Sequence, residues 1–257
     1  NILRRLLRLT RDLTRRANLK VLHTSDVHLT TVGSCKYLEM IADTAKHESV
    51  DLVLIVGDLF DSSRVEPVVV DNAIETLTKM GITTVILPGN HDQMDGTSPL
   101  ERTAFNGMAS SIHLITEVEG ELIRLTDLGV TIWGRAMDEH SPAFQPLHGI
   151  PPLDDHDWRI AMAHGFHVSR GETIDRSSPI LAEEIAILDV DYLALGHVHV
   201  FRDVSEENVK AYYSGAPDEG YFADKFGRSV GHAAIITFDP DFGPEIIHTP
   251  LLEGNRG

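Results

Sequence analysis

Five short polar clusters in this chain combine aspartate, histidine and asparagine, all of which can bind divalent metal ions. In chain order the clusters are Ser25-Asp26-Val27-His28, Gly57-Asp58-Leu59-Phe60-Asp61, Pro88-Gly89-Asn90-His91-Asp92, His164-Gly165 and Gly196-His197-Val198-His199. Carboxylate, imidazole and amide oxygen suit manganese, iron or zinc, whereas a site without thiolate disfavours soft ions. Two such ions can stabilise both the nucleophile and the charge that develops on phosphorus. The residue types therefore suit a site for divalent metal ions that could attract a phosphate and assist its hydrolysis.

Each cluster taken alone has an ordinary structural explanation. Asp and Asn commonly cap helices or occupy turns, so D-x-H, G-D-x-x-D and G-N-H-D could each be a loop. G-H-x-H is more informative, because two imidazoles two positions apart on an extended chain point to the same side. All five clusters directly follow apolar segments, and chance placement explains that joint pattern poorly.

The apolar segments before the clusters are expected to be strands. In the first half, strands and helices are expected to alternate as strand 20–24, helix 37–47, strand 51–56, helix 67–80 and strand 82–87. This order predicts a parallel sheet with right-handed crossovers. Because ligands of open α/β sheets bind at the carboxyl ends of the strands, the clusters are expected to meet there.

The second half of the chain is richer in strands. The expected strands are 121–125, 130–133, 159–163, 192–195, 211–214, 233–238 and 245–249. The segment 137–157 contains four prolines and is expected to be a long irregular loop. The fold class is therefore mixed α/β.

The composition is that of a globular protein. At 257 residues, the chain can bury a substantial core without disulfides or a structural metal. A single cysteine, Cys35, excludes a disulfide within the chain and a thiolate-rich zinc site. No apolar run approaches the roughly 18 residues of a membrane span. We expect a cytoplasmic protein, although the sequence begins at Asn1 and a removed leader stays open.

The negative charge is unevenly distributed. The formal net charge is −17, yet residues 1–20 contain seven Lys or Arg and one Asp, a net charge of +6, which leaves −23 on the remaining residues. An acidic body opposes broad binding of nucleic acid, which relies on Lys and Arg at phosphates. Nucleic acid therefore stays a possible partner, although the acidic body disfavours its binding. The metal site could still attract one phosphate.

Residues 1–18 are predicted to form a basic amphipathic helix that precedes a main domain at 19–257. Ile2, Leu6, Leu9 and Leu13 recur at helical spacing, with arginines between them. The favoured interpretation is a helix docked on its own domain or on a second copy. A lipid- or nucleic-acid-binding arm and a truncated targeting segment are the alternatives.

Together and in this order, D-x-H, G-D-x-x-D, G-N-H-D, H-G and G-H-x-H resemble the calcineurin-like metallophosphoesterase superfamily, over about residues 19–215. The resemblance implies two packed mixed β-sheets flanked by helices, a four-layer sandwich with metal ions at the sheet edge. It also implies two divalent ions as cofactors, with manganese favoured over iron or zinc.

The resemblance further implies a role for each residue of the site. The first metal would be bound by Asp26, His28 and His199, the second by Asn90, His164 and His197, and both by Asp58. A bridging hydroxide would attack phosphorus in line, without a covalent enzyme intermediate. His91 would protonate the leaving oxygen, and Asp61 would hydrogen-bond and orient His91.

Within the superfamily, the sequences of the motifs are most similar to those of SbcD-like DNA exonucleases. The similar stretches are LHTSDVHL (22–29), DLVLIVGDLFD (51–61), LPGNHD (87–92), LALGHVH (193–199) and YSG (213–215). The forms typical of Ser/Thr protein phosphatases are absent from the sequence. SbcD-like nucleases also carry a capping region after this domain, whereas about 40 residues follow Gly215 here. We therefore keep two alternatives, a small-molecule phosphodiesterase of cyclic nucleotide type and a non-catalytic scaffold that binds a partner through residues 1–18.

Several neighbouring residues are expected to have structural roles. His23 is expected to be packed or to lie behind the ligands, and Phe60 is expected in the core. Asp92 is expected to order the loop that presents His91. His140 and His167 have no supporting motif.

Overall fold

The computed structural model describes residues 16–102, 105, 108–153, 156–173, 175–218 and 231–252. These residues form two six-stranded sheets and one two-stranded sheet. Most of the predicted N-terminal helix, residues 1–15, lies outside the described residues, and Arg16–Asn18 have no regular secondary structure.

The first six-stranded sheet has the order β14-β13-β1-β2-β3-β4. Its strands are β1 (Leu19–Thr24), β2 (Leu52–Val56), β3 (Thr83–Leu87), β4 (Ile112–Leu114), β13 (His232–Asp239) and β14 (Gly243–Pro250). Strands β1 to β4 are mutually parallel, while β13 pairs antiparallel with β1 and β14 antiparallel with β13. The polar clusters that follow β1, β2 and β3 therefore emerge at one edge of the sheet.

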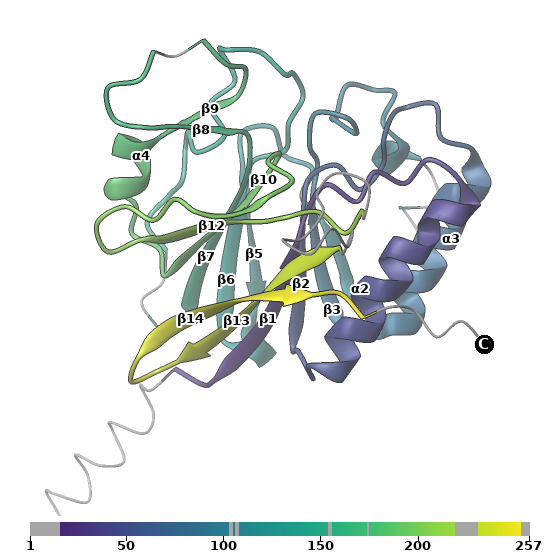
Figure 1. The fold of residues 1–257 in the computed structure, drawn as a ribbon, viewed down its shortest axis with the longest axis horizontal. Helices are drawn as coiled ribbons and strands as arrows, with labels where there is room; N and C mark the ends of the chain where they lie inside the picture. Colours follow the sequence, from purple (N-terminus) through teal and green to yellow (C-terminus); the bar gives the residue numbers. More distant parts are fainter. Residues whose placement is uncertain are drawn as a thin grey trace, which may run out of the picture.

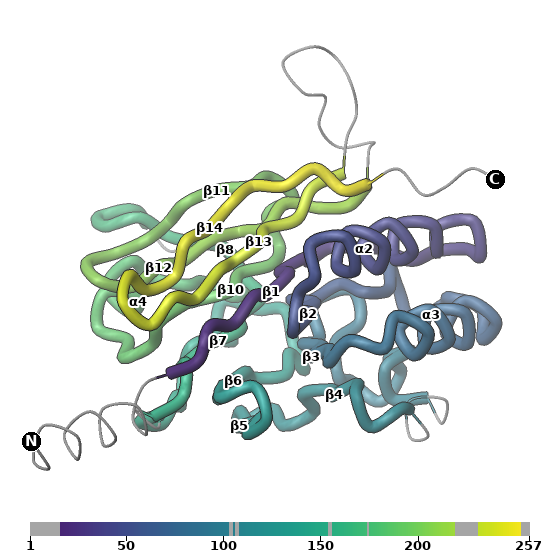
Figure 2. Tube along the Cα trace, turned by 90° about the horizontal axis from the view of Figure 1, so that it is seen from below, coloured from purple at the N-terminus to yellow at the C-terminus, as the bar shows by residue number. Residues whose placement is uncertain are grey.

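Two helices cover the outer face of the first sheet (Figures 1 and 2). They are α2 (Lys36–His47) and α3 (Pro67–Met80). Pro67 lies in the first turn of α3, where its missing N–H costs no hydrogen bond. Gly81 ends α3 with a φ of 70°, a left-handed conformation that glycine adopts without steric cost. Short 3₁₀ turns η1 (Val32–Cys35), η2 (Pro99–Glu101) and η4 (Thr126–Leu128) lie in the connections.

The second six-stranded sheet has the order β11-β12-β10-β7-β6-β5. Its strands are β5 (Glu121–Leu125), β6 (Val130–Gly134), β7 (Trp158–His164), β10 (Tyr192–Gly196), β11 (Phe201–Asp203) and β12 (Lys210–Ser214). The central strands β6, β7, β10 and β12 are parallel. The small sheet pairs β8 (Phe166–Val168) with β9 (Pro179–Leu181), and the short helix α4 (Ala182–Ala186) follows it.

Three apolar layers hold these elements together. One lies between α2, α3 and the first sheet and contains Leu22 and Ile55. The second lies between the two sheets and contains Val21 and Met162. The third lies under α4 and its loops and contains Leu193. Neighbouring residues of β1 enter different layers because successive side chains of a strand point to opposite faces. The predicted four-layer sandwich of two mixed sheets is confirmed.

Within residues 19–250, the predicted strands and helices are confirmed, with ends that differ by at most two residues. The described residues of the proline-rich segment 137–157 contain no helix and no strand. The short elements β4, β8, β9, β11 and α4 were not predicted, because three to five residues are too few for a clear periodic pattern. No helix in the described part of the chain is long and apolar enough to cross a membrane.

The residues just before β1 dock on the second sheet. The Trp158 indole N–H donates to the carbonyl oxygen of Ala17 at 2.7 Å. The Arg16 guanidinium lies 4.7 Å from the Trp158 ring centroid and 2.9 Å from an Asp191 carboxylate oxygen. The chain that leads into β1 is thus fixed from Arg16 onward.

Candidate metal centre

All five polar clusters lie at the carboxyl ends of strands. Asp26 and His28 follow β1, Asp58 and Asp61 follow β2, and Asn90 and His91 follow β3. His164 is the last residue of β7, and His197 and His199 follow β10. These strand ends of the two packed sheets lie close together. Side chains that are far apart in the sequence therefore form one centre.

The first group of side chains consists of Asp26, His28 and His199. One potential ligand atom from each lies within 4.8 Å of the others. Asp26 Oδ2 accepts hydrogen bonds from the Ser25 hydroxyl and from the main-chain N–H of His197. The other oxygen, Asp26 Oδ1, lies 3.5 Å from His199 Nε2. Oδ2 is thus held by two hydrogen bonds, while Oδ1 faces His199 and is available to a metal ion.

The second group consists of Asn90, His164 and His197. The side-chain oxygen of Asn90 lies 3.1 Å from His164 Nε2 and 2.9 Å from His197 Nδ1. The opposite nitrogen of His164, Nδ1, lies 2.9 Å from the carbonyl oxygen of Val56. A hydrogen bond to that carbonyl fixes the ring and leaves Nε2 toward the centre, as behind most metal-binding histidines.

Asp58 lies between the two groups. Its Oδ2 atom is 3.8 Å from His28 Nε2 and 3.3 Å from His164 Nε2. Its Oδ1 atom accepts the main-chain N–H of His91 at 2.9 Å. One carboxylate oxygen thus faces histidines of both groups, and the other is held in place by the backbone.

Buried polar atoms that lack hydrogen bonds indicate that these groups could bind divalent cations. Asp26 Oδ1 and both ring nitrogens of His28 are buried and make no hydrogen bond to other described residues. Each such atom costs roughly 1–3 kcal/mol when no partner is supplied. Carboxylate and imidazole atoms at one position are a donor set for manganese, iron or zinc, and a bound cation would satisfy these atoms.

The backbone at the centre is strained in the way often found at functional sites. Asp26, His28, Asp58 and His197 have φ angles of 55°, 48°, 54° and 96°. Positive φ is uncommon for residues other than glycine, and it persists only where the surroundings over-determine it. The positive φ of His197 also bends the otherwise extended chain. The His197 side chain therefore lies beside Asn90 and the His199 side chain beside Asp26, instead of both pointing to the same side.

The charges of the centre are strongly coupled. Burial opposes ionisation of Asp58, but His164 outweighs it and lowers the pKa of this carboxyl. Burial likewise disfavours charge on His164, but Asp58 raises the pKa of His164 to about 9. Burial and His164 lower the pKa of His197 to about 3. A bound cation would replace the proton that Asp58 and His164 hold together.

Two glycines allow the strand ends to approach this closely. Gly57 has a φ of 85°, and a Cβ atom there would overlap the His164 ring. A Cβ atom at Gly89 would overlap the carboxylate and the main-chain nitrogen of Asp58. The glycine in G-D-x-x-D and in G-N-H-D is therefore explained by contact between neighbouring clusters.

A second layer of polar residues supports the ligand candidates. The Ser25 hydroxyl also lies 3.1 Å from the Ser214 hydroxyl, so Ser214 braces Asp26 from behind. The Tyr213 hydroxyl donates to the carbonyl oxygen of Gly165 at 2.8 Å, next to His164. These contacts give the YSG sequence a structural role at the site.

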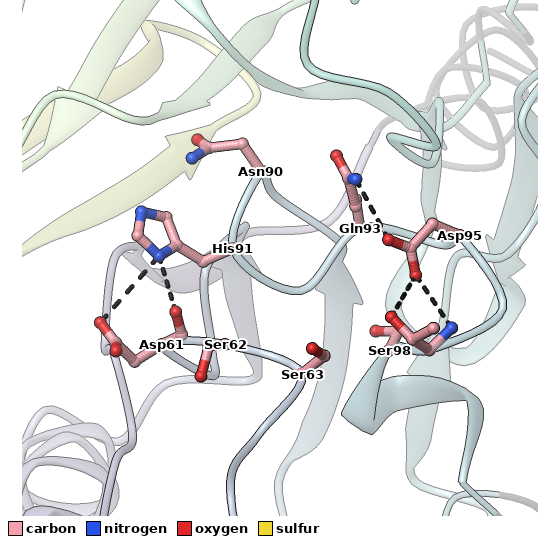
Figure 3. A pocket seen from close by; sticks show the side chains of 9 residues that line it. Asp61, Ser62, Ser63, Asn90, His91, Gln93, Asp95 and Ser98 are labelled. Carbon is pink, nitrogen blue, oxygen red and sulfur yellow. Dashed lines mark hydrogen bonds and ion pairs between the residues drawn. The ribbon is translucent and has the colours of Figure 1, made fainter.

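His91 and Asp61 lie at the mouth of the centre, but their contact differs from the expected one. His91 Nδ1 is 2.7 Å from the main-chain carbonyl oxygen of Asp61 and 4.0 Å from its carboxylate (Figure 3). The Asp61 carboxylate is closer to His28 Nδ1, at 3.4 Å. The hydrogen bond that orients His91 thus uses the backbone, because the turn after β2 brings that carbonyl nearer than the side chain.

His140 is a neighbour of the centre that sequence reasoning missed. Its ring centroid lies 5.4 Å from that of His197, and its Nδ1 lies 3.0 Å from the Ser178 hydroxyl. Burial, with a smaller contribution from His164, lowers the pKa of His140. No motif surrounds His140, and only folding of the proline-rich loop brings it to the site.

The structural roles expected for other residues are confirmed. His23 is fully buried, with Nδ1 2.9 Å from the Tyr192 hydroxyl, and it joins the two sheets. Phe60 is buried in the core. The Asp92 carboxylate accepts the N–H groups of Gly89 and Phe60, which ties the loop that carries His91 to the turn after β2.

Comparison with known families places the chain. The family model of the calcineurin-like phosphoesterases matches residues 19–201, more than half of the sequence. The chain belongs to this family, which confirms the superfamily predicted from the five motifs. Hydrolysis of phosphate esters with divalent metal ions is the activity of the family.

One curated relative is the uncharacterized metallophosphoesterase YhaO of Bacillus subtilis (strain 168). It is 27% identical over 202 residues, which cover 70% of this chain and 46% of the relative. The chain thus spans about half the length of the curated relative that it matches. Similarity to SbcD-like nucleases in particular remains a prediction.

Solved structures share the fold at low identity. The protein TT1561 of Thermus thermophilus superposes with a TM-score of 0.58 at 13% identity, over 91% of this chain and 99% of that one. Purple acid phosphatase PPD1 from yellow lupin (Lupinus luteus) seeds gives a TM-score of 0.52 at 13% identity, over 94% of this chain and 53% of that one. These likenesses show the fold alone.

Proposed function

We propose that this chain is a phosphodiesterase with a binuclear metal centre. The observation that carries the proposal is the position of Asp58 Oδ2, between His28 Nε2 at 3.8 Å and His164 Nε2 at 3.3 Å. A carboxylate that faces two sets of ligands suits a pair of cations, because it can bind both. The orphaned atoms of Asp26 and His28 and the strained backbone support the same proposal.

The proposed ligands are divided between two cations. Asp26, His28 and His199 would hold one cation, Asn90, His164 and His197 would hold the other, and Asp58 would contact both. When bound, the cations would supply Lewis acidity toward the phosphoryl oxygens. Manganese is favoured, with iron and zinc as alternatives of the same ligand preference.

His91 is the proposed proton donor to the leaving oxygen. Its side chain is 42% exposed at the mouth of the centre, so a substrate can reach it. With Nδ1 held at 2.7 Å from the Asp61 carbonyl oxygen, the other nitrogen, Nε2, is available to hold a proton for transfer. Transfer from a positioned side chain commonly contributes about 10²–10⁴-fold to a rate.

Two hollows beside the centre favour a diester over a monoester. The His91 hollow, lined in part by Asp61, Ser62, Ser63, His91, Gln93 and Asp95, measures about 260 Å³. The Lys36 hollow, lined in part by His28, Lys36, Tyr37 and Asp61, measures about 360 Å³. Asp61 belongs to both. A phosphodiester has two substituents to place, and these hollows offer each of them a position.

The nature of the diester separates two candidates. The similarity in motif wording favours DNA and an exonuclease. The charge of −23 outside residues 1–20 favours a small phosphodiester, because binding of a polyanion relies on many Lys and Arg contacts.

The test is hydrolysis of four substrates in the presence of manganese. Bis-p-nitrophenyl phosphate should be cleaved faster than p-nitrophenyl phosphate. Linear single- and double-stranded DNA then distinguishes the exonuclease from the small-molecule enzyme. Faster cleavage of the monoester would contradict the diesterase proposal. Absence of bound metal and of all activity would favour the scaffold.

A further inference from the structure

The His91 hollow differs in charge from the Lys36 hollow. Among the described residues that line it there is neither lysine nor arginine, whereas two carboxylates, those of Asp61 and Asp95, are present. The Lys36 hollow is also lined by two carboxylates, those of Asp61 and Asp218, but it contains in addition the Lys36 ammonium group, which lies 4.7 Å from the Tyr37 ring centroid. A second phosphate would therefore meet like charge on the His91 side.

The negative charge of Asp95 is fixed by its surroundings. Asp95 accepts hydrogen bonds from the Thr97 hydroxyl at 2.7 Å, the Thr97 N–H at 2.9 Å and the Gln93 amide at 3.2 Å. The bonds from Thr97, and then the one from Gln93, lower the pKa of Asp95. Asp95 therefore stays a carboxylate at neutral pH, held at one side of the hollow.

The rest of the wall offers neutral hydrogen-bonding groups. Figure 3 shows Ser62, Ser63 and His91 on one side of the hollow and Gln93, Asp95 and Ser98 on the other. Gln93 donates to Asp95 and keeps its amide oxygen available as an acceptor. Hydroxyl and amide groups of this kind match the alternating donors and acceptors of a polyhydroxylated compound.

The lower wall is preorganised. The Arg102 guanidinium donates to the carbonyl oxygens of Val65 at 2.8 Å and Ser63 at 2.9 Å. Ser98 donates from its hydroxyl to the carbonyl oxygen of Asp92 at 2.6 Å. Because these bonds hold both sides of the hollow, a ligand that binds there has little loop ordering to induce.

We infer that the alcohol released by this phosphodiesterase occupies the His91 hollow and is an uncharged compound with additional hydroxyl groups, such as a nucleoside. The inference rests on the proposed function and names the substrate class. In the reaction, a P–O bond forms to the oxygen of water, and the P–O bond to the leaving alcohol breaks. The leaving oxygen takes a proton from His91, which regains one from the attacking water. The products are a phosphomonoester and the free alcohol.

The test compares dinucleoside monophosphates that carry an extra terminal phosphate on one nucleoside or on neither. With manganese, the compound without extra phosphate should release an uncharged nucleoside. An extra phosphate on the leaving nucleoside should lower kcat/KM at least about tenfold, because it would be repelled by a nearby carboxylate of the hollow. The same phosphate on the retained nucleoside should lower it much less. Equal effects at the two ends would overturn the inference.

Variants locate the cause of this discrimination. Asp95→Asn should reduce the effect of the leaving-side phosphate at least about threefold, because one of the two carboxylates is removed. Lys36→Gln, in the neighbouring hollow, is the matched control and should leave that effect unchanged. Discrimination that survives Asp95→Asn, or that is lost equally in Lys36→Gln, would contradict the assignment to the His91 hollow.

Binding to the chelator-treated protein gives a readout without turnover. Thymidine should shift the NMR signals of the Gln93 side-chain amide, and thymidine monophosphate should shift them less at the same concentration. Equal shifts, or none with either compound, would overturn the inference. Cleavage of bis-p-nitrophenyl phosphate without cleavage of the dinucleoside would refute the inference alone, whereas failure to cleave either would refute the proposed function.

Discussion

The main-chain carbonyl oxygen of Asp61, rather than its carboxylate, lies within hydrogen-bond distance of His91 Nδ1, at 2.7 Å. The orienting contact of the proposed proton donor is therefore independent of the side chain at position 61. The carboxylate, at 4.0 Å from the same nitrogen and 3.4 Å from His28 Nδ1, is placed to influence the first group of ligands instead.

Replacing His91 should slow the reaction according to the leaving group. His91→Ala should keep the metal content and lower kcat by about 10²–10⁴-fold for poor leaving groups, because proton donation is lost. A good leaving group such as p-nitrophenol needs little protonation and should lose less. Steady-state kinetics on a series of aryl diesters measures this, and an equal loss for all members would argue against the acid role.

Replacing the Asp61 side chain should act on metal binding. Asp61→Asn keeps the carbonyl that holds His91, so at saturating metal its dependence on the leaving group should match the wild type. Loss of the contact with His28 should weaken metal affinity by about 10–100-fold, as for other indirect contacts. If Asp61→Asn shows the leaving-group dependence of His91→Ala, the carboxylate is the true partner of His91.

Gly57 should not tolerate a side chain. Gly57→Ala places a methyl group on the His164 ring, which should destabilise the fold by about 1–3 kcal/mol, as overpacking does, and reduce metal content. Gly171→Ala is the control, since Gly171 has a φ of 80° and nothing within 4 Å of its Cβ position. Chemical unfolding and metal analysis compare the two. Equal losses would mean that backbone strain, not contact with His164, is responsible.

The free energy of unfolding should depend on pH through His23, a buried histidine that has no proposed part in the reaction. Burial lowers the pKa of His23 to about 3, while an unfolded histidine titrates near 6.5. Below that value the unfolded chain binds a proton that the folded chain does not, so the contribution is full above pH 6.5 and is lost as pH falls toward 3.

The matched variant is His23→Gln, which keeps a polar group near the Tyr192 hydroxyl but does not titrate. From about pH 7.5 to about pH 5.5, the wild type should lose about 1.4 kcal/mol more unfolding free energy than the variant. Urea unfolding in the presence of a chelator measures the difference without interference from metal binding. The same loss in both proteins would show that His23 is protonated in the folded state.

The sequence predicts the centre well because its chemistry is local to strand ends. Strands such as β2, which is buried throughout, read as continuous apolar runs, and parallel strands deliver the residues that follow them to one edge. His28, Asp58 and His164 could therefore be assigned to one site from the sequence. Their division between two metal ions comes from the family resemblance and stays a prediction, because Asp26 lies near Asp58 and His164 as well as near His28 and His199.

What the sequence did not predict depends on long-range packing. His140 reaches His197 only through the path of an irregular loop, and the contact of His91 with a backbone carbonyl depends on the conformation of the turn after β2. Strand β4 has three residues and forms because β3 offers an edge to pair with. The φ of 96° at His197 overrides the extended geometry assumed for G-H-x-H.

Metal content decides whether Asp58 is shared between two ions, and it is measured by elemental analysis of the wild type and of Asp58→Asn after dialysis against manganese. Two ions per chain are expected in the wild type. In Asp58→Asn we expect weakened binding at both positions and a loss of turnover of at least about 100-fold, the upper end of what even indirect contacts cost. Asp71→Asn, at an exposed position of α3, should behave as the wild type. Two ions and full activity in Asp58→Asn would contradict a carboxylate shared between two metal ions.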